Sequence, residues 1–357
     1  MTGTYRADTT EPTPPTKKIL LTGGAGFIGS HTYVVLLESG FVPIIVDDFS
    51  NSRVAVIERL KTITQVPVLF ERGDVSDTRW LISVMRRHGV DAVVHFAAFK
   101  AVGESVSQPL KYYRNNLCST LAVLEAMQSV GCKTLLYSSS ATVYGDPYCV
   151  PITEDMPRSH KNPYGHTKLI IEDMLAAVVA SEPSLRVAVL RYFNPVGAHE
   201  SGLIGEAPNG APSNLMPTLA QVAVGKLPLL EVYGDDYDTR DGTGVRDYVH
   251  VMDVARGHAA ALAVVAKSAT GFTVNLGTGR GCSVLELIHA FEAASGTTIR
   301  YSVVSRRPGD VAECFADVAA AKSLLSWTAR HSIADMCRDA WRWQRLNPGG
   351  FCELPSA

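Results

Sequence analysis

The first half of the chain alternates short apolar runs with helical stretches, and this alternation constrains the fold more than any other feature of the sequence. The six runs that we expect to form strands are 17–23, 41–48, 66–74, 91–98, 133–140 and 185–194. Between them, helical stretches occupy 28–39, 77–88, 118–130 and 164–180. Strands that are apolar almost throughout are covered on both faces, as they are in parallel sheets. The sequence therefore predicts an α/β protein with a doubly wound parallel sheet.

A glycine-rich segment follows the first predicted strand. The sequence LLTGGAGFIGSH, residues 20–31, places glycines at Gly23, Gly26 and Gly29. We expect these glycines to provide a tight turn, a close backbone approach to a ligand, and close packing of the following helix on the strand. The amino end of that helix would then face a pyrophosphate. The spacing alone fits an ordinary strand–helix turn equally well, but its position after a first strand favours a dinucleotide site.

An acidic residue about 20 residues further on strengthens this interpretation. Asp47 ends the second predicted strand, where a carboxylate can bind the ribose 2′-hydroxyl and repel a 2′-phosphate. The first arginine after it is Arg53, so the sequence favours NAD over NADP. Asp74 ends the third strand and could hold the adenine or cap the next helix. Lys100, in HFAAFKAVGES after the fourth strand, could reach a phosphate or the nicotinamide ribose, or could be a solvated lysine.

A hydroxyl, a phenol and an amine form the candidate catalytic cluster. The fifth strand ends in three serines within LLYSSSATVYG, and Ser140 is the third of them. Tyr164 and Lys168 lie four residues apart, so they share one face of the predicted helix 164–180. A nearby ammonium favours the phenolate, and a phenolate can take a proton from an alcohol while a hydride leaves the same carbon. Together with the glycine loop, the cluster predicts dehydrogenase-type chemistry on an alcohol.

Composition limits the other function classes. The chain has 357 residues, 46% of them hydrophobic, and a net charge of -2 without a long basic run, so we expect no nucleic-acid partner. No apolar run reaches the roughly 18 residues of a membrane span, so we expect no membrane association. The N-terminal segment lacks the apolar centre of a signal peptide. Seven cysteines without CxxC spacing indicate reduced thiols, a cytoplasmic location and no metal site.

Longer motifs add a resemblance that covers almost the whole chain, from Lys18 to Gly350. The glycine loop, HFAAFKAVGES, SSSATVYG, YGHTK, LRYFNPVGAH and above all GTGVRDYVHVMDVA resemble the UDP-glucose 4-epimerases, which are extended short-chain dehydrogenases/reductases. The resemblance implies that bound NAD oxidises C4 of UDP-galactose or UDP-glucose, that the 4-keto sugar rotates, and that it is reduced again on its other face. In this family Tyr164 would be the general base, Lys168 would tune it and bind the nicotinamide ribose, and Ser140 would assist at the 4-hydroxyl.

The resemblance also assigns binding residues. Those implied to bind the cofactor are Gly23, Gly26, Phe27, Ile28, Gly29, Asp47, Asn51, Ser52, Asp74, Val75, Phe96, Ala97, Ala98, Lys100, Asn115, Ser138, Ser139, Tyr164, Lys168 and Tyr192. Those implied to bind the UDP-hexose are Lys100, Ser140, Tyr164, Phe193, Asn194, Asn214, Leu215, Arg246, Tyr248, Arg307, Asp310 and Cys314. A helix-capping Asn214 and surface arginines are the alternatives to the substrate assignment. Arg114 stands where an acidic residue is usual, beside Asn115.

The same pattern predicts the organisation of the chain. We expect a disordered tail over 1–17, an NAD-binding Rossmann domain over 18–194, and a smaller α/β region over 195–357 that binds the UDP-sugar and is interleaved with the first domain. Relatives form homodimers through a helix pair that corresponds to 101–128 and 164–180, so a homodimer is expected; alternatively, these helices simply cover the sheet. A small residue at Cys314 leaves room for an N-acetyl group and predicts that UDP-GlcNAc and UDP-GalNAc are also accepted. The same cysteine could instead be an inert thiol.

Two other functions remain open at this stage. A nucleotide-sugar 4,6-dehydratase or a decarboxylase shares the fold, the cofactor and the Tyr/Lys pair. Related dehydratases carry Asp-Glu after the hydroxyl residue, whereas this chain has Ala141 and Thr142, which cannot shuttle protons as carboxylates do. A non-catalytic protein that senses dinucleotides would keep the glycine loop but would not need Ser140, Tyr164 and Lys168 together.

Overall fold

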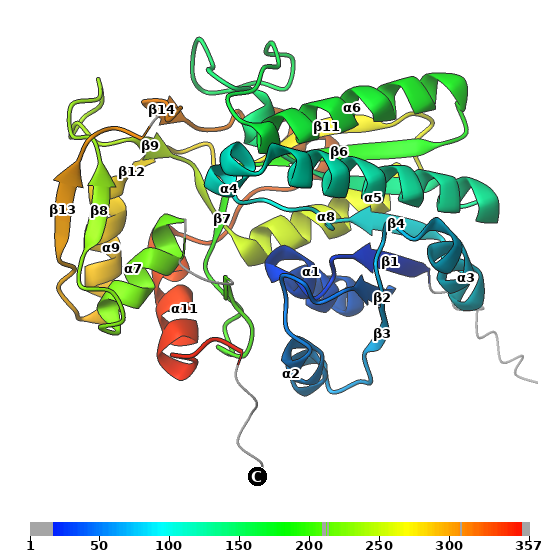
Figure 1. Ribbon diagram of the computed structural model, residues 1–357, viewed down its shortest axis with the longest axis horizontal. Helices are drawn as coiled ribbons and strands as arrows, with labels where there is room; N and C mark the ends of the chain where they lie inside the picture. The colour runs from blue at the N-terminus through cyan, green and yellow to red at the C-terminus, as the bar shows by residue number, and fades with distance from the viewer. Residues whose placement is uncertain (1–16, 209–211, 213, 308, 352–357) are drawn as a thin grey trace, which may run out of the picture.

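Seven parallel strands form the central sheet, in the order β11-β6-β5-β4-β1-β2-β3 (Figure 1). The computed structural model describes residues 17–208, 212, 214–307 and 309–351. The strands are β1 (Lys18–Thr22), β2 (Val42–Asp47), β3 (Leu69–Arg72), β4 (Ala92–His95), β5 (Thr134–Ser140), β6 (Arg186–Tyr192) and β11 (Phe272–Leu276). The doubly wound parallel sheet predicted from the sequence is confirmed. The predicted tail lies outside the described residues apart from Lys17.

Successive side chains of the inner strands enter two different cores, which explains why these strands are apolar throughout, whereas the edge strand β3 is largely exposed. In β1, Ile19 and Leu21 join the core on one face of the sheet, whereas Leu20 joins the core on the other. All three are fully buried. In β5, Leu136 and Leu135 are divided between the faces in the same way. A period-two pattern buried on both sides leaves no polar face, as expected for a sheet covered by helices.

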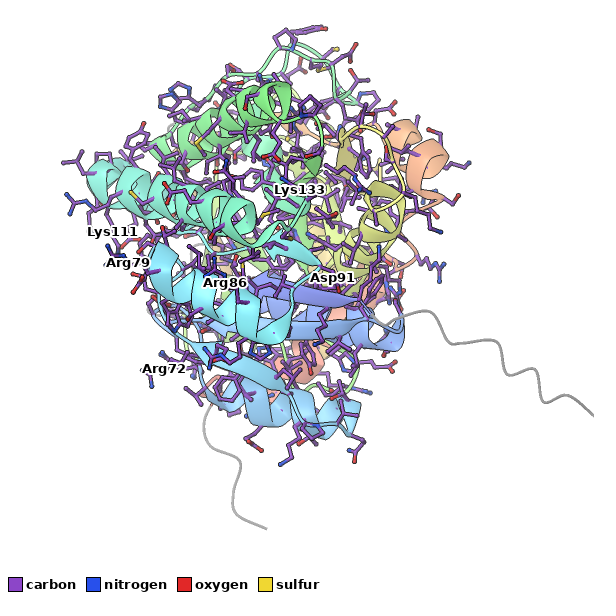
Figure 2. The ribbon with its side chains drawn as sticks, turned by 90° about the vertical axis from the view of Figure 1, so that its right-hand side faces the viewer. Arg72, Arg79, Arg86, Asp91, Lys111 and Lys133 are labelled. Carbon is purple, nitrogen blue, oxygen red and sulfur yellow. The ribbon has the colours of Figure 1, made fainter. Side chains whose placement is uncertain are left out.

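Helices cover each face of the sheet. One face carries α1 (Phe27–Glu38), α2 (Ala55–Thr64), α8 (Val251–Val265) and α10 (Ala319–Leu325). The other carries α3 (Thr78–His88), α5 (Pro109–Val130) and α6 (Pro163–Ser181). Exposed charged side chains, among them Arg79 and Arg86 of α3 and Lys111 of α5, lie on the outer side of this second layer (Figure 2). No helix in the described part of the chain has the length and apolarity that a membrane crossing requires.

Smaller elements build the part of the molecule next to the carboxyl ends of the strands (Figure 1). Two short elements follow central strands: α4 (Val102–Ser107) and the 3-10 turn η1 (Ala141–Val143). Two small sheets have two strands each: β7 (Asn194–Val196) pairs with β10 (Tyr248–His250), and β8 (Leu230–Tyr233) pairs with β13 (Tyr301–Val304). A third small sheet has three strands, in which β9 (Val245–Arg246) lies between β12 (Cys282–Ser283) and β14 (Glu313–Cys314). The helices α7 (Leu215–Ala223), α9 (Val284–Ser295) and α11 (Ile333–Leu346) pack around a third apolar core.

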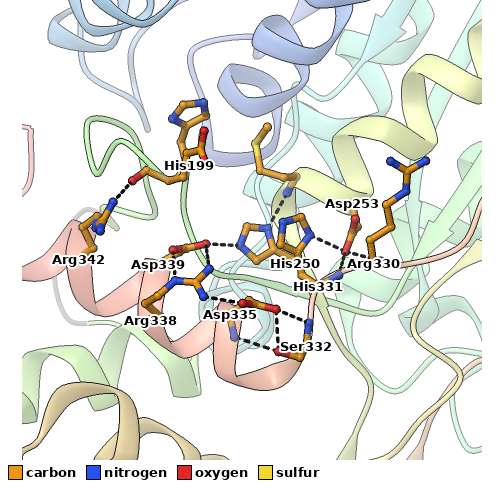
Figure 3. A network of polar contacts seen from close by, with 12 residues as sticks. His199, His250, Asp253, Arg330, His331, Ser332, Asp335, Arg338, Asp339 and Arg342 are labelled. Carbon is orange, nitrogen blue, oxygen red and sulfur yellow. Dashed lines mark hydrogen bonds and ion pairs between the residues drawn. The ribbon is translucent and has the colours of Figure 1, made fainter.

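A buried polar network fixes α11 to the end of β10 (Figure 3). His250 Nε2 lies 3.3 Å from Asp339 Oδ2, and His331 Nδ1 lies 2.9 Å from Asp253 Oδ2. The two imidazole rings stack with their centroids 4.1 Å apart. Burial lowers the pKa of His250, although Asp339 opposes this effect. The network therefore holds together a strand end near the expected substrate site and a helix from the end of the chain.

Candidate active site

The glycine loop has the geometry that its spacing predicts. Gly23 has a φ of 67°, and a Cβ added to it would lie 2.8 Å from the backbone nitrogen of Ala97. A Cβ on Gly29 would lie 2.6 Å from the carbonyl oxygen of Gly23. Both distances are too short for any side chain, so the turn and the start of α1 require glycine at these positions. The loop brings the amino end of α1, capped by Gly26, to the carboxyl ends of β1 and β4.

Asp47 is held firmly at the end of β2. Its Oδ1 accepts hydrogen bonds from the backbone N–H of Phe49 at 2.9 Å and from the hydroxyl of Ser52 at 2.8 Å. Its Oδ2 accepts one from the backbone N–H of Ala25 at 3.0 Å. Burial raises the pKa of Asp47, and these hydrogen bonds act in the opposite direction. A fixed carboxylate beside the glycine loop is suited to select a ribose with a free 2′-hydroxyl.

A cavity of about 670 Å³ runs along these strand ends. Most of the residues that the sequence assigned to the cofactor line it: Gly23, Gly26, Phe27, Ile28, Gly29, Asp47, Asn51, Ser52, Asp74, Val75, Phe96, Ala97, Ala98, Lys100, Asn115, Tyr164, Lys168 and Tyr192. Ser138 and Ser139 belong to the same prediction but do not line the cavity. Ser138 offers its carbonyl to Lys168, and Ser139 donates to Glu172 Oε1 at 2.6 Å, so both support the strand end from behind.

The three candidate catalytic residues meet where β5 ends and α6 begins. Ser140 is the last residue of β5, and Asn162 caps α6 by accepting a hydrogen bond from the backbone N–H of Gly165 at 2.8 Å. The first turns of α6 then carry Tyr164 and Lys168, which are both buried. Lys168 Nζ donates to the carbonyl of Ser138 at 2.6 Å and lies 6.0 Å from the centroid of the Tyr164 ring. The expected i, i+4 face is therefore directed at the end of β5.

The charge of a second lysine, Lys100, also acts on the Tyr164 phenol. Burial raises the pKa of Tyr164, whereas a hydrogen bond with Ser140 and the charge of Lys100 lower it. Burial lowers the pKa of Lys168 to about 7, and Glu172 opposes that effect. The sequence assigned the cationic effect on the phenol to Lys168, which lies beside the ring, and the structure adds Lys100 as a cation that acts in the same direction.

A second group of predicted residues lies on the small triplet of strands. Cys314 of β14 is in register with Arg246 of β9, and Arg246 Nη2 lies 4.0 Å from Asp310 Oδ1. Arg307 stacks over the ring of Tyr233, with its Cζ 4.1 Å from the ring centroid. Burial raises the pKa of the Cys314 thiol to about 11, so the side chain is a neutral thiol. The group combines two guanidinium groups and a carboxylate, the donors and acceptor expected for a diphosphate and a ribose.

Two contacts connect this group with the catalytic strand end. Asn194 of β7 is in register with Tyr248 of β10, and the backbone N–H of Asn194 donates to the carbonyl of Asp247 at 3.0 Å. Phe193 and Cys314 share an apolar cluster with Val143, which follows Ser140 by three residues. The predicted substrate residues are thus arranged around the ends of β5 and β6. Of these residues, Lys100, Tyr164 and Asn214 line the main cavity.

Asn214 and Leu215 lie at the start of α7. Asn214 occupies the N-cap position, but its side chain makes no capping hydrogen bond. Instead, its Nδ2 donates to Glu206 Oε1 at 3.1 Å inside the cavity. The helix-capping alternative for this side chain is therefore wrong.

Several residues of the site were missed by sequence reasoning. Glu206 and Tyr112 line the cavity, and Tyr233 lies beneath Arg307. Glu104 also lines it and accepts a hydrogen bond from Lys111 at 2.6 Å. Glu104 lies within a motif that was examined for Lys100, but Glu206 stands in a loop whose sequence carries no signal beyond one charge.

This fold and this site define a dinucleotide-dependent enzyme of the short-chain dehydrogenase/reductase type. Residues 20–340 match a family model described as GDP-mannose 4,6 dehydratase. A UDP-glucose 4-epimerase from Bacillus subtilis is 53% identical over 333 residues, which are 93% of this chain and 98% of that protein. One from Dictyostelium discoideum is 51% identical and covers 95% of this chain and 99% of its own length. The chain belongs to the UDP-glucose 4-epimerase family.

Solved structures agree with this assignment. A UDP-glucose-4-epimerase from Stenotrophomonas maltophila with bound NAD and formylated UDP-arabinopyranose has a TM-score of 0.92 and 50% identity, and the match covers 93% of this chain and 99% of that one. A UDP-glucose 4-epimerase from Bifidobacterium longum in complex with NAD+ and UDP has a TM-score of 0.91 and 50% identity, with 94% and 100% coverage.

Proposed function

We propose that this protein interconverts UDP-galactose and UDP-glucose with NAD as its cofactor. The observation that carries the proposal is the meeting of Ser140, Tyr164 and Lys168 beside a cavity that begins at the glycine loop. The two relatives and the two solved structures, at 50–53% identity over nearly full length, point to the same activity.

The residues present fit NAD. The glycine cradle leaves no room for a side chain at Gly23 or Gly29, and Asp47 stands where a ribose hydroxyl would bind. Lys100 and Lys168 supply cations at the other end of the cavity. When bound, NAD supplies the capacity to accept and return a hydride at C4 of the sugar.

The protein residues would then control the proton and the position of the sugar. Tyr164, as phenolate, takes the proton of the C4 hydroxyl and later returns it. Ser140 holds the same oxygen and, by its hydrogen bond, favours the ionised phenol. Arg246, Arg307 and Asp310 would hold the uridine diphosphate, so that the 4-keto sugar can turn its other face without leaving the protein. Because few of the predicted substrate contacts involve the hexose itself, such a turn would break few hydrogen bonds.

The competing dehydratase function lacks its acid/base pair. The family model carries a dehydratase description, but the residues after Ser140 are Ala141 and Thr142 in η1. Neither can act as the carboxylate pair that elimination of water requires. A function limited to dinucleotide sensing would not explain the buried Tyr164 and Lys168 beside Ser140. Epimerisation is the function that this set of residues supports best.

We further propose the organisation of the protein in the cell. Residues 18–194 would form the NAD-binding domain together with β11, α8 and α10, and the rest of 195–357, which is interleaved with it, would form most of the UDP-sugar-binding region. A homodimer would form through α5 and α6, because Leu110 and Leu121 of α5 are 81% and 45% exposed. The reduced cysteines favour a cytoplasmic location. Size-exclusion chromatography with light scattering would test the dimer, and a monomeric mass would contradict it.

Cys314 supports a broader substrate range. It is a small, partly buried residue paired with Arg246, so we propose that UDP-GlcNAc and UDP-GalNAc are accepted as well. A Cys314→Tyr variant should lose turnover of the N-acetylated sugars and retain turnover of UDP-galactose. Unchanged turnover of both kinds of substrate would refute this role.

The decisive experiment is incubation of the purified protein with UDP-galactose and no added NAD. We expect UDP-glucose to appear, because the cofactor remains bound during purification and turnover. The Tyr164→Phe variant should be nearly inactive while it still contains dinucleotide, as measured after release from the denatured protein. Full activity of that variant would remove Tyr164 from the role of general base.

A further inference from the structure

Glu206 is a charged residue of the cavity to which no role has yet been given. Its backbone carbonyl accepts a hydrogen bond from Nε1 of Trp343, on α11, at 3.1 Å. Its side chain is 12% exposed and lines the cavity. The backbone of Glu206 is thus anchored to α11, while its side chain faces the cavity in which the cofactor and the substrate are expected to bind.

One oxygen of this carboxylate joins two residues that belong to different ends of the site. Glu206 Oε1 accepts a hydrogen bond from Lys100 Nζ at 2.9 Å and another from Asn214 Nδ2 at 3.1 Å. Lys100 follows β4 at the cofactor end, and Asn214 precedes α7 in the substrate region. A single carboxylate therefore fixes both side chains relative to each other.

On the side that faces away from the main cavity, the described residues around Glu206 are uncharged. A small pocket beside it is lined by residues of α7, α11 and the segment after β7, which are Gly197, Met216, Pro217, Ala220, Ala340, Trp343 and Gln344. The main cavity also carries the charges of Glu104, Lys111 and Lys168, but the described cation that is hydrogen-bonded to Glu206 is Lys100.

Lys100 connects Glu206 electrostatically with Tyr164. Lys100 Nζ lies 5.8 Å from the centroid of the Phe27 ring, and its charge favours ionisation of the Tyr164 phenol. The other groups that interact with this phenol are Ser140, Lys168 and the phenols of Tyr112, Tyr137 and Tyr192. An anion bound to Lys100 opposes the effect of the lysine, because the potentials of the two charges at the phenol have opposite signs.

We infer that Glu206 is a positioning residue for the reaction: its carboxylate holds Lys100 and Asn214 at the junction of the cofactor and substrate ends of the cavity that Tyr164 also lines. This inference rests on the proposed function, in which Tyr164 is the general base. It assigns Glu206 no contact with the reacting atoms.

Two substitutions separate the charge of Glu206 from its hydrogen bonds. Glu206→Gln keeps an oxygen that can accept from Lys100 and Asn214 but removes the negative charge. We expect ionisation of Tyr164 to move to lower pH by roughly half to one unit. Because the phenolate is the active form, the acidic limb of the kcat profile should move in the same direction. Lys100→Met removes the cation and should move both in the opposite direction.

Glu206→Ala removes the hydrogen bonds as well. It should release Asn214 and Lys100 and raise KM for UDP-galactose several-fold, whereas Glu206→Gln should leave KM near that of the wild type. Glu200→Gln is the matched control, because Glu200 is an exposed glutamate of the same loop. It should change neither the pH profile nor KM.

A second measurement does not depend on turnover: the near-ultraviolet absorption of tyrosinate is followed as a function of pH. For each protein, the same titration of a variant that also carries Tyr164→Phe is subtracted, so that the difference reports Tyr164 alone. A Glu206→Gln titration that coincides with the wild type, or that moves to higher pH, would overturn the inference. If the wild type does not convert UDP-galactose at all, the proposed function fails, while the tyrosinate titrations still decide the role of Glu206. If Glu206→Ala does not fold, the Gln variant decides alone.

Discussion

The buried ion pair beneath the catalytic strand end provides the strongest test of how the site is supported. Arg191 of β6 and Glu172 of α6 are 5% and 3% exposed, respectively. Arg191 Nε donates to Glu172 Oε1 at 3.0 Å, and Nη2 donates to Oε2 at 2.5 Å. Glu172 also accepts from Ser139, the neighbour of Ser140. Replacing Glu172 with methionine should therefore leave a buried guanidinium without its counter-ion.

The expected loss follows from these contacts. Two hydrogen bonds between charged groups contribute about 1.5–3 kcal/mol each, so their removal should lower the free energy of unfolding by roughly 3–6 kcal/mol. Breaking one side of a buried ion pair typically costs about 3–5 kcal/mol, which agrees with this range. Part of the guanidinium remains bonded, because Nη1 donates to Tyr144 Oη and to the carbonyl of Glu154, both at 3.0 Å. We therefore expect the lower half of the range.

Chemical denaturation of four proteins would measure this effect: the wild type, Glu172→Met, Arg191→Met and the double variant. The double variant should be more stable than either single variant, since it removes both buried charges, and Arg158, which also donates to Glu172 at 3.1 Å, keeps its pair with Asp173. Glu58→Gln is the control, because its pair with Lys61 lies elsewhere on the surface, is 70% and 59% exposed, respectively, and should be worth at most about 1 kcal/mol. Single variants that lose less than about 1 kcal/mol, or losses that simply add in the double variant, would refute the reasoning.

Three further predictions concern the pH dependence of stability, the glycine loop, and the strands that carry Arg246 and Tyr248. Burial lowers the pKa of His31 and His95 to about 3 and that of His258 to about 4, so these histidines are neutral when folded but take up protons when unfolded as pH falls below about 6.5. The free energy of unfolding should therefore be highest above that pH and fall on acidification. In denaturation experiments between pH 7 and 5, the His258→Asn variant should lose stability less steeply with falling pH, by up to about 1.4 kcal/mol per pH unit. An unchanged slope would exclude His258 as a source of the pH dependence. Gly29→Val should lower the dinucleotide content of the purified protein, because its Cβ would lie 2.6 Å from the carbonyl of Gly23, and full content would show that the loop can adjust. Asp247, which lies between Arg246 and Tyr248, is fully buried and accepts hydrogen bonds from Thr278, Gly279 and Ala316. The Asp247→Leu variant should therefore bind UDP more weakly, as measured by calorimetry. Wild-type affinity would show that this carboxylate does not position Arg246 and Tyr248.

The sheet could be predicted from the sequence where its strands are apolar on both faces. All six strands expected in the first half are present, with boundaries that differ by up to a few residues. The seventh strand, β11, was missed because Thr273 and Asn275 interrupt its apolar pattern. Asn275 is fully buried, and its side chain is bonded to Tyr144 and to the carbonyl of Ile152, more than 120 residues earlier. Such partners cannot be read from a local pattern.

Some helices could likewise be predicted from the sequence, and others could not. The helix α6 begins at Pro163, one residue before the predicted start at 164, but α5 begins at Pro109 rather than near residue 118. The helix α2 was not predicted, and its N-cap, Val54, offers no capping side chain as a signal.

The site was predictable where its residues are close in sequence. The glycine loop and the Tyr164/Lys168 pair depend on spacings of three and four residues. The pairing of Lys100 with Glu206 spans 106 residues and depends on how the loop after β7 folds over the cavity. Sequence reasoning therefore found Lys100 but neither its counter-ion nor its influence on Tyr164.

The position of β11 has a consequence for how this protein can be divided. This strand comes from residues 272–276, yet it is hydrogen-bonded to β6 and forms one edge of the sheet that carries the glycine loop. A fragment that stopped at residue 194 would leave the edge of β6 unpaired and would lose α8, which packs against α1. The nucleotide-binding half therefore cannot be excised as an autonomous module, and a ribosome must have released residue 276 before that half can reach its final form.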